Sequence, residues 1–563
     1  SKGIEIKAVS GEEMELDFGE TSEDTPEQER PSDADNHQTP QQTEEEKTNN
    51  LIGKKLATYY AQILFYAFLT ESPVDSLQAI IASIEGSEEN KRIAGHVGLK
   101  VSLLSLVQQK SNVFSLRGLD YKIENLNGLM RDESLTPMKR VEVAMAKFGR
   151  LSSSEIVTPQ SAALEMIHAL GDDAITNETR ILDIASKQGE FTRAFISKYG
   201  TEIDKNIYAL PTSSVSYEFT RKVYSLLGLD TDQVISDFTT YDLLNPEHKE
   251  SLIQQLKDMN FDLVIGNPPY QQADGGAAAS AKPIYQEFVT IAKEVSTTYT
   301  SIIIPARWYT GGKGLDEFRA SMLTDKHIKL LYDYQRPDEV FPDTPNRGGL
   351  CFIVRDNNFD NTLPLPEVIS NRGNQEIVSQ VRSIQTAGLE IFIRHQEAIS
   401  ILEKVTENIS FTSLSDAISA RRPFGIDGNI TKDIAVFKKQ QTPRFSIICY
   451  GRSSSLGYIA LSTVKNNSEW INRWKVFMPY ANNIGTELND DNLNAFVGQP
   501  NSVATETFLV VGADLSLDEN SAQALVQYLK TRFARFMHSL SKASQHATSK
   551  TYRFVPLQDF TVQ

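Results

Sequence analysis

Between about residues 150 and 356 the sequence alternates short β-branched runs with helical segments, and this alternation constrains the fold more than any other feature. The runs span residues 180–184, 203–210, 261–265, 301–304 and 350–354. Such alternation is typical of strands joined by helices in a doubly wound α/β sheet. Ligands of these sheets bind beyond the carboxyl ends of the strands. The residues that directly follow each run are therefore the candidates for a functional site.

The rest of the chain has different sequence patterns, which predict further domains. At 563 residues the chain is too long for one ordinary hydrophobic core. We expect an acidic disordered tether, a helical domain, the α/β domain and a mixed α/β domain, over residues 1–50, 51–149, 150–356 and 357–563. The last domain is expected to close with one helix from Glu519 to about Ser544. Because the chain begins with Ser1 and a solvated segment, we also expect it to be cut from a longer polypeptide.

The net charge of −17 does not argue against nucleic acid as a partner, because most of it lies in the tether. Residues 1–50 contribute 15 acidic and 4 basic side chains, which leaves the remaining chain nearly neutral. No apolar run approaches the roughly 18 residues needed to span a bilayer. The two cysteines, Cys351 and Cys449, form no Cys-x-x-Cys pair. These features predict a soluble cytoplasmic protein without a membrane partner, a disulfide framework, a zinc ribbon or an iron–sulfur site.

The segment Gly266-Asn267-Pro268-Pro269-Tyr270 follows the run at 261–265 and carries the clearest chemical signal. Two consecutive prolines fix φ and remove two backbone donors, so the turn is rigid and presents carbonyl oxygens. The side-chain oxygen of Asn267 and the carbonyl of Pro268 can together accept both hydrogens of a planar exocyclic amino group. Drawing these hydrogens toward acceptors localises the nitrogen lone pair and makes the nitrogen a better nucleophile. Tyr270 offers an aromatic face on which a purine can stack.

Asn-Pro-Pro-Tyr after a buried strand resembles the catalytic motif of the amino-methyltransferases, which transfer a methyl group from S-adenosylmethionine to adenine N6 or to a related amide nitrogen. The resemblance implies a Rossmann-like S-adenosylmethionine-dependent methyltransferase sheet over the α/β domain. It also implies that Asn267, Pro268, Pro269 and Tyr270 are the catalytic residues. Neither a metal nor a covalent enzyme intermediate is needed for such a transfer, which depends on orientation and hydrogen bonding.

The same resemblance implies a set of cofactor-binding residues, which are Thr158, Pro159, Asp183, Ala185, Gly189, Phe191, Asp237 and Phe238. In the family the Thr-Pro pair lies beside the methionine part of the cofactor, and the Asp-Phe pair binds its adenine. Two positions depart from the family pattern. Lys187 stands where the first glycine of the cofactor loop is expected, and the acid that grips the ribose is missing near Leu210. These departures imply weaker cofactor binding or a replacement group.

The order of these motifs, followed by a long carboxyl-terminal portion, resembles the gamma class of adenine DNA methyltransferases from bacterial restriction–modification systems. The resemblance is to a type IIG-like modification and target-recognition segment, with residues 357–563 as the target-recognition domain. It implies double-stranded DNA as a partner, and nuclease or helicase segments of a larger restriction polypeptide as further partners. An adenine must flip out of the duplex to reach such a site, where Tyr270 and Phe341 would stack on its two faces.

The carboxyl-terminal segment independently favours DNA binding because it concentrates basic residues. These are Lys530, Arg532, Arg535, His538, Lys542, His546, Lys550 and Arg553. The spacing of residues 532, 535, 538 and 542 is close to one face of a helix, and such a stripe can hold phosphates. A solvated helix face is the alternative interpretation. Further candidates for base reading lie beside glycine turns, at Arg421, Arg422 and Arg452.

Two other functions fit part of the sequence. A glutamine-amide or RNA amino-methyltransferase could use the same turn, although such chains are generally shorter and lack a large recognition domain. Alternatively, the chain is a DNA-binding specificity or scaffold segment whose cofactor site has decayed, as Lys187 and the missing acid near Leu210 suggest. Binding of S-adenosylmethionine distinguishes this last hypothesis from both enzymes.

Overall fold

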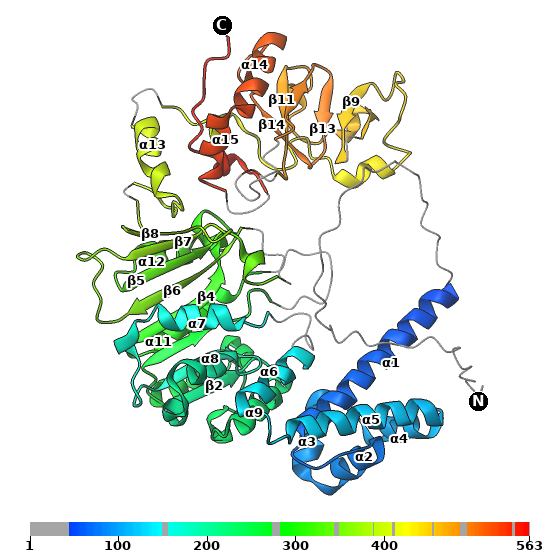
Figure 1. Ribbon diagram of the computed structural model, residues 1–563. Coiled ribbons are helices and arrows are strands. Elements are labelled where there is room, and N and C mark those ends of the chain that lie inside the picture. The colour runs from blue at the N-terminus through cyan, green and yellow to red at the C-terminus, as the bar shows by residue number, and fades with distance from the viewer. Residues whose placement is uncertain are drawn as a thin grey trace. The chain divides into compact units, whose positions relative to one another are not determined.

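A computed structural model describes residues 44–561 of the chain, except for 149–155, 273–281, 313, 343–347, 387, 408–410, 453–454, 483, 485–492 and 543–545 (Figure 1). The chain divides into two compact units. The first contains the residues up to 153 together with 221–229, and the second contains 154–220 and 230–563. None of the helices described is long and apolar enough to cross a membrane.

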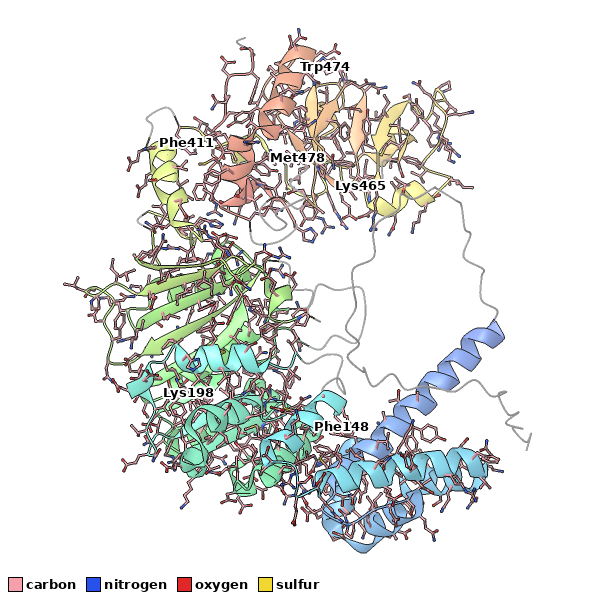
Figure 2. The ribbon with its side chains drawn as sticks, viewed as in Figure 1. Phe148, Lys198, Phe411, Lys465, Trp474 and Met478 are labelled. Carbon is pink, nitrogen blue, oxygen red and sulfur yellow. The ribbon has the colours of Figure 1, made fainter. Side chains whose placement is uncertain are left out.

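The first unit is helical throughout its described residues. Its helices are α1 (Glu44–Leu69), α2 (Leu77–Gly86), α3 (Glu88–Val97), α4 (Val101–Lys110), α5 (Val113–Met130) and α6 (Pro137–Phe148), and residues 221–227 belong to a helix that begins in the second unit. Helix α1 begins inside the segment that we expected to be a tether, whereas residues 1–43 lie outside the described residues. Phe148, labelled in Figure 2, packs on Phe65 and Phe68 with ring centroids 5.3 and 5.1 Å away. Aromatic side chains therefore contribute to the core of this unit.

The second unit is built on an eight-stranded sheet of order β2-β1-β3-β4-β6-β5-β7-β8. Its strands are β1 (Ile181–Ser186), β2 (Ile207–Pro211), β3 (Leu263–Gly266), β4 (Tyr299–Pro305), β5 (Ile328–Tyr334), β6 (Leu350–Asp356), β7 (Glu367–Asn371) and β8 (Ile377–Val381). Strands β2, β1, β3 and β4 are parallel, and β6 runs antiparallel between β4 and β5. A parallel bridge from Ala209 to Val234 continues the sheet beyond β2. The predicted Rossmann-like α/β fold is confirmed.

Helices accompany the strands in the order expected of a doubly wound sheet. They are α7 (Gln160–His168), α8 (Glu190–Tyr199), α9 (Ser214–Leu227), α10 (Lys249–Asp258), α11 (Tyr285–Val295) and α12 (Asp316–Leu323). The main core of the unit joins Ile184 of β1, Val264 of β3 and Phe288 of α11. Strands β1 and β3 are buried at every residue. Burial on both faces explains why they read as continuous apolar runs.

The structure corrects several expected elements. Residues 201–206 form a 3₁₀ helix, so the run predicted to be a strand from 203 begins as a strand only at Ile207. Strand β5 was not predicted, because Lys329 and Asp333 interrupt its apolar run. Strands β7 and β8 extend the sheet past residue 356, where we expected the α/β domain to end. The sheet and the predicted domain boundary therefore do not coincide.

The carboxyl-terminal part holds two three-stranded sheets, of order β10-β9-β13 and β12-β11-β14. The strands are β9 (Ile447–Tyr450), β10 (Leu456–Ile459), β11 (Lys475–Pro479), β12 (Phe496–Gly498), β13 (Ser502–Ala504) and β14 (Phe508–Val511). The helices are α13 (Gln396–Thr406), α14 (Glu519–Lys530) and α15 (Arg532–Ser539). The single closing helix from Glu519 to about Ser544 is therefore wrong. Thr531 adopts an extended backbone and its side chain caps α15 by accepting from the Ala534 N–H, which ends one helix and starts the next.

Candidate active site

The end of strand β3 leaves little room for a side chain beside its neighbour β1 at the carboxyl edge of the sheet. A Cβ on Gly266, the last residue of β3, would lie 3.0 Å from Cγ2 of Ile184 and 3.4 Å from Oδ1 of Asp183. Glycine at this position therefore permits the close approach of the two strand ends. The approach places the Asn-Pro-Pro-Tyr turn beside the loop that follows β1.

Asn267 is held at two of its polar groups. The residue is buried, and its Nδ2 donates to the backbone oxygen of Ile156 over 3.1 Å. Its own backbone oxygen accepts from Nζ of Lys187 over 2.7 Å. With Nδ2 committed to Ile156, Oδ1 is the side-chain atom left to accept from a substrate. The turn, the loop after β1 and the segment leading to Thr158 thus come together, but the sequence did not identify Ile156 or the contact made by Lys187.

Tyr270 presents part of its ring while its hydroxyl is buried. The residue is partly buried against the main core, and its ring meets that of Tyr285 edge-on at 6.5 Å and 81°. The buried hydroxyl has no hydrogen-bond partner among the described residues. Burial raises the pKa of Tyr270, so the phenol stays protonated at neutral pH. Phe341 is buried, and stacking on a base would require its side chain to move.

The loop after β1 turns sharply into helix α8. Gly189 takes a left-handed backbone with φ of 70° immediately before Glu190, which explains the glycine at this position. The Asp183 carboxylate accepts from the Ala185 N–H over 3.1 Å. One carboxylate oxygen of Glu190 accepts from the N–H groups of Lys187 and Gln188, over 3.2 and 2.8 Å. Phe191 is buried in α8.

Several buried polar atoms at this edge of the sheet have no partner among the described residues. They are Oγ1 of Thr158, Oδ2 of Asp183 and Oε1 of Glu190. Burial, followed by repulsion from Glu190, raises the pKa of Asp183 well above its usual range, and Lys187 opposes this rise. Unpaired buried acceptors are costly unless a ligand satisfies them. A ligand with an ammonium group, such as the methionine part of S-adenosylmethionine, fits these acceptors.

The remaining cofactor candidates lie at the ends of β2 and of the next segment. Leu210 is fully buried, so nothing at that position replaces the missing acid. Two hydroxyl groups follow β2, those of Thr212 and Ser216, and they lie within hydrogen-bond distance of each other at 3.0 Å. Asp237 is exposed and Phe238 is buried in the main core. Their predicted contacts with an adenine ring stay predictions.

Most basic residues predicted to bind DNA are accessible. Arg452, Lys530, Arg532, His546 and Lys550 are exposed, and Arg535 and Arg553 are half-buried. Arg421 and Arg422 are exposed and both form ion pairs of 3.0 Å with Glu506. Because Glu506 already balances this arginine pair, a phosphate or base would have to compete with it.

Lys542 has a structural environment that the charge pattern did not predict. It is buried beyond the end of α15, and its Nζ donates to the backbone oxygens of Asn482 and Ile484 over 2.6 and 2.7 Å. A buried ammonium committed to two carbonyls is not available to a phosphate. The predicted DNA contact of Lys542 and the basic stripe through residues 532, 535, 538 and 542 are therefore wrong.

His538, in the same stripe, is also buried. Its Nδ1 lies 3.1 Å from the backbone oxygen of Thr551, and its ring stacks on Tyr552 at 3.8 Å between centroids. Burial, together with repulsion from Lys542, lowers the pKa of His538 to about 3. The imidazole is therefore neutral at physiological pH and adds no positive charge to the segment.

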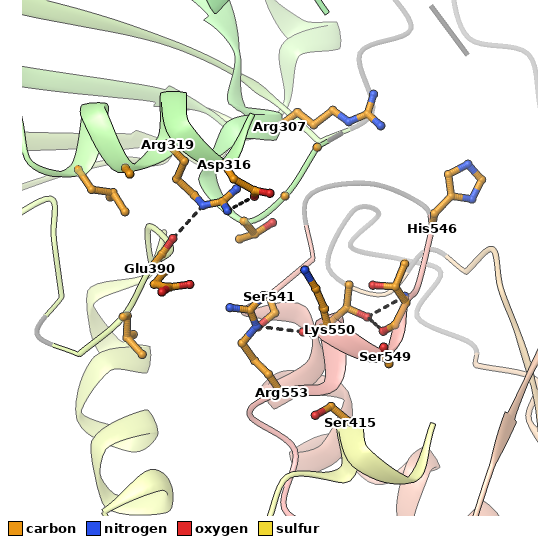
Figure 3. A pocket seen from close by; sticks show the side chains of 18 of the residues that line it. Arg307, Asp316, Arg319, Glu390, Ser415, Ser541, His546, Ser549, Lys550 and Arg553 are labelled. Atoms are coloured by element: carbon orange, nitrogen blue, oxygen red, sulfur yellow. Dashed lines mark hydrogen bonds and ion pairs between the residues drawn. The ribbon is translucent and has the colours of Figure 1, made fainter. Parts of the chain in front are cut away.

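A cavity of about 1250 Å³ gathers basic side chains from distant parts of the second unit (Figure 3). His546, Lys550 and Arg553 line it from the carboxyl-terminal segment. Arg307 and Arg319 line it from the segments that follow β4. Neither arginine was among the basic residues predicted to bind DNA, although Arg307 lies shortly after the strand run at 301–304.

Together, the sheet order, the antiparallel β6 and a polar site at the carboxyl ends of β1 and β3 define the Rossmann-like fold of S-adenosylmethionine-dependent methyltransferases. Residues 196–341, which include the Asn-Pro-Pro-Tyr turn, match the family model of the Eco57I restriction-modification methylases. Over 166 residues the chain is 30% identical to an uncharacterized adenine-specific methylase of Mycoplasma pneumoniae (strain M129), and the match covers 29% of this chain and 38% of that protein. The chain thus spans about two fifths of the length of this curated relative.

Among solved structures, the chain is similar to the cryo-EM structure of a DrdV–DNA complex. The TM-score is 0.50 at 11% sequence identity, over 92% of this chain and 69% of the other. At this identity the similarity concerns the fold. The family and sequence matches support the resemblance to restriction–modification methylases with adenine specificity that the motifs indicated.

Proposed function

We propose that this chain is an S-adenosylmethionine-dependent DNA methyltransferase that methylates adenine N6 within a restriction–modification system. We assign it to the gamma class and propose that it is the modification and target-recognition segment of a type IIG-like enzyme. The observation that carries the proposal is the geometry of Asn267, whose Nδ2 is bonded to Ile156 so that Oδ1 is left as an acceptor. The matches to adenine-specific and restriction–modification methylases support the same substrate.

In the proposed reaction Asn267 and Pro268 accept the two hydrogens of the adenine amino group. This orientation concentrates the lone pair of N6 on the side opposite the acceptors and directs it at the methyl carbon. The Asn267 side chain is not a strong base, so the amine proton leaves to water after the transfer. Pro269 stiffens the turn, which keeps both acceptor oxygens in place throughout the reaction.

The cofactor is proposed to bind along the carboxyl edge of β1. When bound, S-adenosylmethionine supplies a methyl group on a positively charged sulfur, which makes the group transferable to nitrogen. The unpaired oxygens of Thr158, Asp183 and Glu190 would hold its polar methionine part. Asp237 and Phe238 are proposed to contact its adenine, and Pro159, Ala185, Gly189 and Phe191 to shape the surrounding loop.

The target adenine is proposed to leave the DNA stack and enter beside the turn. Flipping costs a few kcal/mol of stacking and pairing, which stacking on an aromatic side chain offsets. The partly exposed ring of Tyr270 suits this role, and its edge-on contact with the ring of Tyr285 supports the proposed orientation. Phe341 is the proposed second aromatic face, provided that its buried side chain moves.

The DNA backbone is proposed to lie along exposed basic residues of the carboxyl-terminal segment. Lys550 and Arg553 share their cavity with Arg307, so both sides of the cavity offer cations to phosphates. Arg319 also lines the cavity, but it is buried and already paired with Asp316. Arg421, Arg422 and Arg452 remain proposed base or phosphate contacts, as do Lys530, Arg532, Arg535 and His546. We also propose that residues 357–563 recognise the target and that nuclease or helicase segments of a longer polypeptide act with this chain.

A transfer assay with a matched control tests the proposal. Purified protein is incubated with S-adenosylmethionine labelled in its methyl group and with plasmid DNA, and label in DNA is counted. We expect Asn267→Ala to reduce kcat by about 10²–10³-fold, the usual cost of losing one preorganised hydrogen-bond group in an active site. Calorimetry should show that the variant still binds the cofactor. The control Asn358→Ala removes an exposed amide after β6 and should change neither quantity.

Transfer by the wild type to a protein or RNA but not to DNA would replace the proposed substrate. Absence of both transfer and cofactor binding would favour a DNA-binding segment with a decayed cofactor site.

A further inference from the structure

Lys187 stands where the family pattern has a glycine, but its backbone conformation is one that any residue can adopt. Among the described residues, Gly189 supplies the left-handed turn of the loop, whereas Lys187 is not one of the positions with positive φ. The side chain at position 187 is therefore tolerated by the backbone of the loop. This leaves the question of what its buried ammonium does.

The ammonium of Lys187 connects two segments that are 80 residues apart in the sequence, by donating to the backbone oxygen of Asn267 over 2.7 Å. The residue is only 4% exposed, so this hydrogen bond forms away from bulk water. Charged donors in such surroundings make short, strong hydrogen bonds. The contact therefore ties the loop after β1 to the turn after β3.

Lys187 lies within electrostatic reach of the two carboxyl groups of its own loop. Burial and then Glu190 raise the pKa of Asp183, and Lys187 opposes this rise, so the three groups interact. Glu190 in turn accepts from the backbone N–H of Lys187 over 3.2 Å, which fixes the residue from which the side chain extends. Partners of opposite charge make a buried ammonium tolerable.

The accepting oxygen belongs to the peptide bond between Asn267 and Pro268. This bond has no N–H, so no backbone donor can fix the plane of the peptide. The plane determines where the Asn267 side chain and the Pro268 carbonyl point. Ile156 holds the amide end of Asn267 and Lys187 holds its backbone oxygen, so the residue is fixed at two points.

We propose that Lys187 is a positioning residue for methyl transfer, which orients the acceptor oxygens of the Asn267–Pro268 turn through the Asn267 carbonyl. This inference rests on the proposed function and deepens it. Lys187 acts through Asn267, so its loss should lower kcat far more than it changes KM for either substrate. Displacements of about 1 Å in an active site can cost 10²-fold in rate.

Three variants of the full chain separate this role from a structural one. Lys187→Met keeps most of the side-chain volume without the charge, Lys187→Gly restores the residue of the resembled pattern, and Lys187→Ala leaves space for a small amine. Lys475→Met is the matched control, because Lys475 is also a buried lysine that donates to backbone oxygens, here of Ile471, Arg473 and Gln499. Thermal unfolding, cofactor calorimetry and steady-state methylation of plasmid DNA are measured for each.

We expect Lys187→Met and Lys187→Gly to fold and to bind S-adenosylmethionine within about threefold of the wild type, with kcat reduced by about 10- to 100-fold. Ethylammonium ions should restore at least part of the lost kcat of Lys187→Ala, but not that of Asn267→Ala. Lys475→Met should lower Tm and leave kcat of the folded protein unchanged.

Unchanged kcat in both the methionine and glycine variants would overturn the inference while leaving the proposed function intact. A loss confined to KM for the cofactor, or failure of all three variants to fold, would also overturn it. Inactivity of the wild type toward DNA would instead contradict the proposed function itself.

Discussion

Two polar regions of the second unit differ in how they hold their charges. At the carboxyl ends of β1 and β3, Asp183, Lys187 and Glu190 are buried together, and two of their carboxylate oxygens have no partner among the described residues. In the carboxyl-terminal segment, buried Lys542 has two backbone partners and buried His538 has one, and the remaining basic residues are half-buried or exposed. Buried charged groups whose polar atoms lack hydrogen-bond partners mark a candidate ligand site. Buried charged groups whose polar atoms are paired instead stabilise the fold.

The first prediction tests whether the unsatisfied region is a ligand site. We expect Asp183→Asn to weaken binding of S-adenosylmethionine by about 10- to 100-fold, the usual range for a hydrogen bond to a charged group. Calorimetric titration measures the change. An unaltered Kd would show that the free oxygen of Asp183 does not meet the cofactor.

The same variant should stabilise the protein without ligand. The pKa of Asp183 is raised in the folded chain, so the folded state holds its proton at pH values where the unfolded state has lost it. The free energy of unfolding therefore falls as pH rises above about 4, the pKa of Asp183 in the unfolded state. Asp183→Asn removes this decrease. Its gain in Tm should be present at pH 7.5 and vanish below pH 4.

Asp325→Asn is the opposing control. Burial acts to raise the pKa of Asp325, but Lys293 at 2.7 Å and Arg355 outweigh it, so the pKa is lowered overall. Its ionised form is therefore stabilised in the folded protein, and replacement should reduce Tm at pH 7.5. A gain in Tm for both variants would contradict the distinction between the two carboxylates.

The second prediction contrasts two lysines of the carboxyl-terminal segment. Lys550→Met, at an exposed position of the cavity, should weaken DNA binding and lower the slope of its salt dependence by about 1, with little change in Tm. Lys542→Met should destabilise the fold by about 1–3 kcal/mol, because the oxygens of Asn482 and Ile484 lose their donor.

Fluorescence anisotropy at several salt concentrations and chemical unfolding measure these two effects. The contrast fails if folded Lys542→Met protein loses as much DNA affinity as Lys550→Met does.

The smallest effect concerns pH and His538. Its pKa of about 3 lies below the value of about 6.5 for an unfolded histidine, so between these values only the unfolded state takes up the proton. Stability therefore falls as pH drops below about 6.5, and this contribution reaches about 1 kcal/mol at pH 5.5. His538→Gln should remove that part of the loss. Equal pH dependence of unfolding in the wild type and the variant would show that folding does not lower the pKa of His538.

Sequence patterns predicted the strands that are buried on both faces of the sheet. Strands β1, β3, β4 and β6 were predicted because their apolar runs are buried on both faces. The alternating burial of β7 and β8 leaves only short, half-polar segments, which resemble loops in a sequence. Strand β8 at the edge of the sheet and its neighbour β7 therefore extend the sheet without a strong sequence signal of their own.

The part of the candidate site that depends on a few consecutive residues could be predicted from the sequence. The part that depends on contacts between distant residues could not. Two prolines after a strand define the Asn267 turn from five residues alone. The bonds of Asn267 to Ile156 and Lys187 join residues 111 and 80 positions away, which no local pattern encodes. The basic residues of the carboxyl-terminal segment looked alike in the sequence, because a charge pattern does not reveal that Lys542 and His538 are buried.

We propose that the Asn267 turn methylates adenine in DNA. Methylation-sensitive sequencing tests this on plasmid DNA from cells that express either the wild type or Asn267→Ala. We expect N6-methyladenine at one recurring sequence with the wild type and its absence with the variant. Unmethylated adenine in the presence of an expressed wild type able to bind S-adenosylmethionine, or methylation that persists with Asn267→Ala, would contradict it.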